Sequence, residues 1–234
     1  MPRYRAVFFD AGFTVIDMRV PEIELLRRVT CEQGLRATPS DLKRAQQAAR
    51  AFFSQHYYRP NDIWSNDAAI LAFWTAYYRT ALEALRWPAE QAQEAAADLA
   101  AALEKPEMWR PFPEAPAVLA GLKESGYRVG ILSDWSSGLP AILDALGLAA
   151  YADFAVVSAI EGVAKPQPRF FQIALERAGV APGEVLMVGD NHYADIQGAS
   201  QVGIRGLLLD RDGRQQQPTQ TIIRHLEEVW GHLA

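Results

Sequence analysis

Short runs of apolar and β-branched residues recur along much of the 234-residue chain, each closed by Gly, Ser or Asp. Such runs are typical of the buried strands of a parallel sheet. They cover residues 4–9, 127–133, 154–158, 184–189 and 204–209. Helix-length amphipathic stretches alternate with them at 114–125, 137–147, 168–178 and 194–202, and a last helix is expected near 218–233. This alternation predicts an α/β protein with a doubly wound, Rossmann-like parallel sheet.

The segment 17–107 has a different pattern. It shows no convincing strand, but helical periodicity is present in 22–33, 40–57, 66–86 and 89–104. We therefore predict two domains, an α/β core formed by residues 1–16 and 108–234 and an all-helical cap formed by residues 17–107. Both ends of the insertion return to the C-terminal end of the first strand, where ligands bind in such sheets. An insertion at that place can close over a site and exclude water.

Composition narrows the class of protein. Half of the residues are hydrophobic (50%), 22% are charged and the net charge is −5, as in an ordinary soluble globular protein. The negative charge and the lack of a basic cluster argue against nucleic acid as a partner. No apolar run reaches the roughly 20 residues of a membrane span. The single cysteine, Cys31, cannot form an internal disulfide, and the N-terminal residues do not resemble a signal peptide, so a cytoplasmic protein is expected.

Reactive side chains follow four of the predicted strands, in "DAGFT", "SDWSS", "EGVAKPQP" and "GDNHYADIQGA". Because parallel strands end at the same edge of a sheet, we expect these side chains to lie close together. They are Asp10, Thr14, Ser133, Lys165, Asp190 and Asp195. Any one of them has an ordinary explanation as a turn or capping residue. Together, carboxylates that can hold Mg²⁺ and a hydroxyl and a lysine that can bind phosphoryl oxygens predict a cation and phosphate site.

The order Asp-x-x-x-Thr, strand-end Ser, Lys-Pro and Gly-Asp-x-x-x-x-Asp resembles the haloacid dehalogenase superfamily, and the helical insertion resembles its first cap class. Most members are Mg²⁺-dependent phosphohydrolases. The resemblance implies a phosphatase that acts on a small phosphomonoester through an aspartyl-phosphate at Asp10. The oligomeric state stays open between a monomer and a homodimer. Ser133 and Lys165 would hold the phosphoryl oxygens. The implied metal ligands are Asp10, Asp190, Asp195 and the main-chain carbonyl of Gly12, and Gly12 and Asp134 are further candidates for substrate contact.

Gly12 departs from the superfamily's phosphatase pattern. In that pattern the residue two positions after the nucleophile is usually a second aspartate, which protonates the leaving oxygen and then activates water. Gly12 can offer a carbonyl but no proton. General acid–base catalysis is worth about 10²–10⁴ in rate, so its loss should matter most for a poor leaving group such as an alkoxide. Glycine also permits a positive φ and close approach of other groups.

Three alternatives remain open. Dehalogenases of the superfamily also lack the second aspartate, but they use no metal and tend to lack the Gly-Asp pair that Gly189 and Asp190 form here. Phosphonate-cleaving members need a cap lysine, and the insertion offers only Lys43 and Lys105, which we expect to be solvated. A catalytically weak or inactive descendant that binds metal and phosphate is the third. Retention of Asp10 with the other motifs favours an enzyme.

Some residues have two open interpretations. Asp134, Asp17 and His192 are candidates to replace the missing acid, although solvated or capping roles explain each of them. Thr14 would either hydrogen-bond near the nucleophile or cap local backbone. The segment "SQHYYRPNDIWSND" would either line a substrate pocket or pack between cap helices; its candidates are His56, Tyr57, Tyr58, Arg59 and Trp64. The stripe "ILAFWTAYYRTALEAL" is expected to be core packing.

Overall fold

The computed structural model describes residues 3–57, 63–213 and 220–233, and a parallel sheet of six strands lies at the centre of this part of the chain. The strands are ordered β5 (Phe154–Val157), β4 (Arg128–Ser133), β1 (Ala6–Phe9), β6 (Val185–Gly189), β7 (Arg205–Leu209) and β8 (Ile222–Ile223). The first five match the predicted strands to within two residues, so the predicted α/β fold is confirmed.

Strand β1 is central because all four of its residues are apolar and fully buried. It pairs with β4 on one side and β6 on the other, so that Phe9 lies between Ile131 and Val188. Val7 and Phe9 face one hydrophobic cluster, whereas Ala6 and Phe8 face the other, as the two-residue period of a strand requires. Asp10, the next residue, therefore leaves the sheet at its middle, between the ends of two neighbouring strands.

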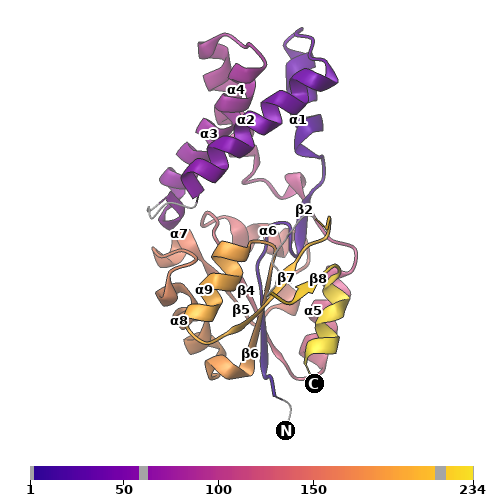
Figure 1. Ribbon diagram of the computed structural model, residues 1–234, viewed down its shortest axis with the longest axis vertical. Coiled ribbons are helices and arrows are strands. Elements are labelled where there is room, and N and C mark those ends of the chain that lie inside the picture. Colours follow the sequence, from indigo (N-terminus) through magenta and orange to yellow (C-terminus); the bar gives the residue numbers. More distant parts are fainter. Residues whose placement is uncertain (1–2, 58–62, 214–219, 234) are drawn as a thin grey trace.

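Helices cover both faces of the sheet (Figure 1). On one face lies α5 (Ala115–Glu124), and α8 (Pro168–Ala178) and α9 (Gly198–Gln201) lie on the other. The remaining core helices are α6 (Leu139–Ala145) and the short α7 (Ser158–Glu161). The helix predicted at 194–202 begins earlier, as a π-helical turn, η5 (His192–Gln197), that continues into α9.

The end of the chain differs from its prediction. Residues 218–219 of the helix expected at 218–233 lie outside the described residues. Ile222 and Ile223 instead form β8, because these β-branched residues pair with the edge of β7. A 3₁₀-helix, η6 (Leu226–His232), follows and buries Leu226 and Val229 against the sheet's flank.

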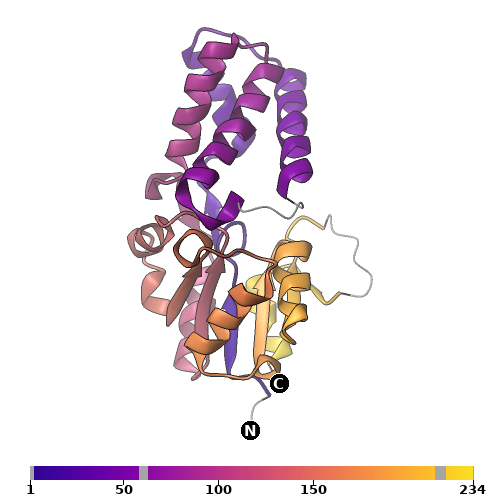
Figure 2. The ribbon, with the colours of Figure 1, turned by 90° about the vertical axis from the view of Figure 1, so that its left-hand side faces the viewer.

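Between residues 19 and 105 the described chain forms four long helices, α1 (Glu22–Glu32), α2 (Pro39–Tyr57), α3 (Asp67–Ala84) and α4 (Ala89–Ala102), and a 3₁₀-turn, η1 (Ile63–Ser65). They stack beyond the C-terminal edge of the sheet (Figures 1 and 2). Their bounds agree closely with the predicted helices. No helix within the described ranges is both long and apolar enough to cross a membrane.

The chain enters the helical insertion and leaves it again through a two-stranded antiparallel sheet. It pairs β2 (Ile16–Met18) with β3 (Trp109–Pro111), which follows the 3₁₀-turn η2 (Pro106–Met108). The expectation that segment 17–107 holds no strand was therefore wrong at Asp17 and Met18, and β3 was not predicted. Three-residue strands are too short to show an alternating pattern, and only their pairing across a long insertion reveals them.

Candidate active site

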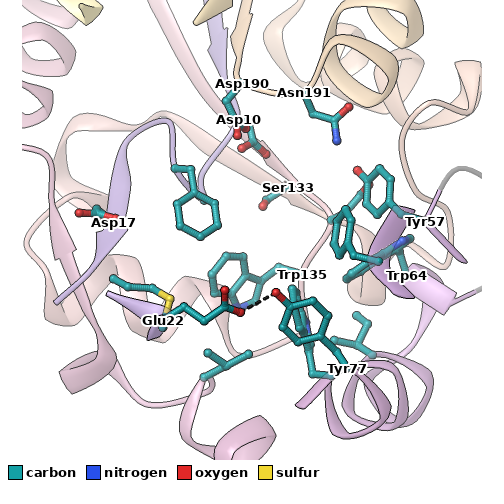
Figure 3. A pocket seen from close by; sticks show the side chains of 18 of the residues that line it. Asp10, Asp17, Glu22, Tyr57, Trp64, Tyr77, Ser133, Trp135, Asp190 and Asn191 are labelled. Atoms are coloured by element: carbon teal, nitrogen blue, oxygen red, sulfur yellow. Dashed lines mark hydrogen bonds between the residues drawn. The ribbon is translucent and has the colours of Figure 1, made fainter. Parts of the chain in front are cut away.

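Four loops at the C-terminal edge of the sheet open into one cavity of about 730 Å³, and helices α1, α2 and α3 contribute to its wall. Figure 3 shows side chains that line this cavity. The structure brings nearly all of the predicted site residues to its wall. They are Asp10, Gly12, Ser133, Asp134, Lys165, Asp190 and Asp195. Thr14 is the exception among the predicted site residues. Its buried hydroxyl has no hydrogen-bond partner in the described structure, so it forms neither a bond near Asp10 nor the alternative cap of local backbone.

Lys165 is the centre of this arrangement. Its Nζ atom donates to Oδ1 of Asp10 and to Oδ1 of Asp195, both at 2.6 Å, and to the carbonyl oxygen of Leu132 at 3.2 Å. Burial lowers the pKa of this lysine, but the charges of Asp10 and Asp195 raise it by more, so its pKa is raised overall. The ammonium therefore stays protonated, and Lys165 acts as a fixed positive charge rather than as a nucleophile.

Asp195 is held in place by its own loop. It is completely buried within η5, and its Oδ2 atom accepts a hydrogen bond of 3.0 Å from the backbone N–H of Asn191. Its carboxylate occupies the space that a Cβ atom on Gly189 would fill. Glycine at 189 is therefore a packing requirement of Asp195. π-helical turns such as η5 are frequent at functional sites, where they re-aim a side chain.

The donor set fits a hard divalent cation. Carboxylate oxygens of Asp10, Asp190 and Asp195 lie within 4.8 Å of one another. Burial, and then the neighbouring charges of Asp10 and Asp195, raise the pKa of Asp190 well above its ordinary value. Burial likewise raises the pKa of Asp195, and Lys165 opposes this only in part. One lysine does not offset three crowded carboxylates, whereas Mg²⁺ takes oxygen ligands of this kind.

A model of the haloacid dehalogenase-like hydrolase family matches residues 4–203 of the sequence. The chain belongs to this family. The match confirms the resemblance that the four motifs indicate. It covers strands β1, β4, β5 and β6, the helical insertion and the four loops that carry Asp10, Ser133, Lys165 and Asp195.

Relatives of the hydrolase include proteins named as phosphatases and a protein named as a dehalogenase. The phosphoserine phosphatase of Thermus thermophilus is 31% identical, over 86% of this chain and 88% of its own. The (S)-2-haloacid dehalogenase 4A of Burkholderia cepacia is 29% identical, over 98% of this chain and 95% of its own. A magnesium-bound crystal structure of YfnB from Bacillus subtilis superposes with a TM-score of 0.75 at 21% identity, covering 99% of each chain, which shows the shared fold.

The loop that carries Asp10 in this hydrolase is a tight turn. The carbonyl oxygen of Ala11 accepts the N–H groups of Val15 at 2.9 Å and Ile16 at 3.0 Å, and Phe13 has a φ of +56°. A bulky residue in this left-handed region is strained, and such strain clusters at functional sites. Gly12 does not use the positive φ that glycine permits. It permits close approach instead, because a Cβ atom at Gly12 would lie 3.2 Å from the ring of Trp135.

The candidate replacement acids of the hydrolase lie in different surroundings. Asp134 is at the site: its Oδ1 atom accepts the backbone N–H of Lys165 at 2.9 Å, and its Oδ2 atom accepts the Tyr57 hydroxyl at 3.4 Å. Burial raises the pKa of Asp134 to about 6, and Lys165 opposes this shift in part. Asp17 forms an ion pair of 2.8 Å with Arg110. His192 does not line the cavity as far as its described wall extends.

The insertion contributes more to the cavity than the sequence indicated. Tyr57 and Trp64 line it, whereas Tyr58 and Arg59 lie outside the described residues. His56 instead stacks on Phe52 with a centroid distance of 4.1 Å. Lys43 and Lys105 are exposed and are not among the described wall residues, as expected for solvated charges.

The stripe expected to be only core packing also reaches the cavity, through Ile70, Trp74 and Tyr77. Sequence reasoning missed other wall residues in the motif loops themselves and at the edges of the insertion. They are Phe13, Glu22, Glu104, Trp109 and Trp135. A signal was present for two of them, because Phe13 and Trp135 are large apolar residues in loops at the ligand-binding edge of the sheet.

Proposed function

We propose that this hydrolase is a Mg²⁺-dependent phosphatase that forms an aspartyl-phosphate at Asp10, with the helical insertion acting as its cap. The observation that carries the proposal is the pair of 2.6 Å contacts that join Lys165 to Asp10 and Asp195. A carboxylate is repelled by a dianionic phosphate unless positive charge lies beside it, and Lys165 supplies that charge at the nucleophile itself. We expect the substrate to be a small phosphorylated metabolite of the cytoplasm.

The residues have distinct roles in this mechanism. Lys165 holds one oxygen of Asp10, which fixes the carboxylate and leaves its other oxygen to attack phosphorus. Ser133, at the end of β4, is positioned to donate its hydroxyl to a phosphoryl oxygen. Asp195 orients Lys165 from the opposite side. Asp10, Asp190 and Asp195, with the carbonyl of Gly12, would hold Mg²⁺, which would offset the charge of the phosphoryl group.

The crowding at Asp190 supports a phosphatase over a dehalogenase. Displacing halide from an uncharged carbon needs one carboxylate nucleophile and no further cation. A third, partly buried carboxylate beside Asp10 and Asp195 adds repulsion that a bound divalent cation would relieve. The arrangement is therefore better suited to charge-neutralised attack on phosphate.

The experiment compares wild type with Asp10→Asn for phosphate release from phenyl phosphate, with Mg²⁺ and with EDTA. We expect release that needs both Asp10 and Mg²⁺, since asparagine keeps the shape but not the nucleophile. Parallel assays follow halide release from 2-chloropropionate. Halide release that survives EDTA, together with no phosphate release, would transfer the protein to the dehalogenase alternative.

A further inference from the structure

Three aromatic side chains form one side of the cavity beside Asp10. We term these residues, Phe13, Trp109 and Trp135, the aromatic wall. Trp109 is in edge-to-face contact with both of the others: its ring centroid lies 6.3 Å from that of Phe13 and 4.7 Å from that of Trp135. All three line the cavity, and Figure 3 shows Trp135 among its lining side chains.

Phe13 is the residue of this wall with the clearest sign of a ligand contact. It is 47% exposed, although it is a large apolar side chain within the nucleophile loop. Its left-handed backbone, with φ at +56°, is strained for a residue of this size. The edge-to-face contact with Trp109 covers only part of the ring, and the rest of this apolar surface is free to meet a ligand in the cavity.

Trp135 takes the space beside the nucleophile that a side chain at position 12 would need. Its ring lies 3.2 Å from where a Cβ atom of residue 12 would be. Its backbone is tied on both sides, since its N–H donates to the Ser158 hydroxyl at 3.0 Å and its carbonyl accepts the N–H of Ala159 at 3.2 Å. The site therefore has an indole ring next to Gly12 where the superfamily's phosphatase pattern has an acid.

The far side of the cavity is aromatic and acidic. Trp74 and Tyr77 of α3 lie in edge-to-face contact at 5.3 Å, and the Tyr77 hydroxyl donates to Glu22 at 2.5 Å (Figure 3). Glu104 is a second carboxyl group of the lining. A cavity of about 730 Å³ is far larger than a phosphate group, so it has room for a ring-sized leaving group. Arg50 also lines the cavity, but carboxylates outnumber it on the described wall and disfavour a leaving group with a negative charge of its own.

Building on the phosphatase function proposed above, we propose that the substrate is an aryl phosphate whose uncharged ring lies against the aromatic wall. Asp10 bonds to phosphorus, the bond from phosphorus to the aryl oxygen breaks, and the electron pair leaves as an aryloxide. The ring delocalises that charge: a phenol has a pKa near 10, so its oxygen leaves without a proton from residue 12. Water then bonds to phosphorus, the bond to Asp10 breaks, and the proton lost by water neutralises the aryloxide through solvent.

The test uses three esters that separate ring recognition from leaving-group strength. Phenyl phosphate has a ring and a good leaving group, benzyl phosphate has a ring and an alkoxide, and cyclohexyl phosphate has an alkoxide and no aromatic ring. We expect kcat for phenyl phosphate to exceed that for the other two by about 10²–10⁴, the usual worth of an acid catalyst. We expect KM to be similar for the two ring-bearing esters and about tenfold higher for cyclohexyl phosphate.

Variants of the aromatic wall test whether it binds the ring of the substrate. Two substitutions remove an aromatic ring from the wall, Trp135→Leu and Phe13→Leu, and the second lies at a half-exposed position where folding tolerates it. Each should raise the dissociation constant of phenylphosphonate several-fold, to about that of cyclohexylphosphonate. Trp230→Leu is the matched control, because Trp230 is 40% exposed and packs on Tyr127 of the core. Titration by tryptophan fluorescence, or by calorimetry for Trp135→Leu, reads binding without turnover.

The outcomes separate this inference from the proposed function. Mg²⁺-dependent hydrolysis in which cyclohexyl phosphate matches phenyl phosphate would overturn the aryl assignment and leave the phosphatase standing. Equal weakening of both phosphonates by Trp135→Leu and Phe13→Leu would also overturn it. If none of the three esters is hydrolysed, both proposals are overturned.

Discussion

Replacing Gly189 by alanine tests how the site is assembled. The added Cβ atom would occupy the position of the Asp195 carboxylate, which is completely buried, so this side chain would have to move. Displacement of Asp195 would remove one of the two carboxylates that Lys165 contacts at 2.6 Å, and the acceptor of the Asn191 N–H group. Breaking a buried ion pair by removing one partner costs about 3–5 kcal/mol.

The lower end of this range applies, because Lys165 keeps its contact with Asp10. We therefore expect Gly189→Ala to lower the free energy of unfolding by about 3 kcal/mol, which corresponds to a fall in Tm of roughly 6–12 °C for a chain of this size. Urea unfolding followed by circular dichroism measures the free energy directly, and a thermal scan measures Tm.

Gly183→Ala is the matched control. A Cβ atom at Gly183 would meet no atom within 4 Å, so its free energy of unfolding should stay within about 0.5 kcal/mol of wild type. If Gly189→Ala has the same free energy of unfolding as wild type, the prediction is wrong, because Asp195 is then not confined by the end of β6. An equal loss in Gly183→Ala would show a general intolerance of alanine instead.

Three further predictions concern single side chains of the site. Gly12→Asp should gain little activity toward benzyl phosphate by itself, because the Trp135 ring lies 3.2 Å from the new Cβ atom, whereas Gly12→Asp with Trp135→Leu should gain it; equal gains in steady-state assays of both variants would contradict this. Lys165→Ala should reduce kcat and also weaken phenylphosphonate binding, since the ammonium faces the nucleophile, and unchanged values of both would remove Lys165 from the site's chemistry. In the folded state the pKa of Asp134 is about 6, above its ordinary value, so the folded protein holds this proton more tightly than the unfolded chain does. Ionisation of Asp134 therefore lowers the free energy of unfolding as pH rises from about 4 to 6. Asp134→Asn should therefore gain roughly 2 kcal/mol relative to wild type at about pH 7.5 compared with about pH 4.5, and a pH-independent difference in urea unfolding would contradict that sign.

The parts of the fold that were predictable are those set by local pattern. Fully apolar runs such as Ala6–Phe9 can only be buried on both faces, and a polar residue that directly follows one must lie at the sheet edge. Asp10, Ser133, Lys165 and the acids after β6 therefore came together as expected. The helices α1–α4 were also predictable, because their apolar residues recur with the helical period.

What could not be predicted depends on contacts between distant segments. The sequence shows that Gly12 lacks an acid, but only the structure shows Trp135 beside it. Trp74 and Tyr77 have the spacing of core residues, and whether such a stripe packs or lines a cavity depends on how the helices sit over the sheet. The helix expected at the C-terminus failed because Ile222 and Ile223 pair with β7, a partner that local propensity does not reveal.

The most direct test of the account is to look for a phosphoryl group on Asp10. Wild-type protein would be mixed with Mg²⁺ and phenyl phosphate, quenched in acid within one turnover, and digested for peptide mass spectrometry. We predict one phosphoryl group on the peptide that contains Asp10, and none in Asp10→Asn treated in the same way. Phosphate release by wild type with no phosphorylated peptide at any quench time, or with equal release by Asp10→Asn, would contradict it.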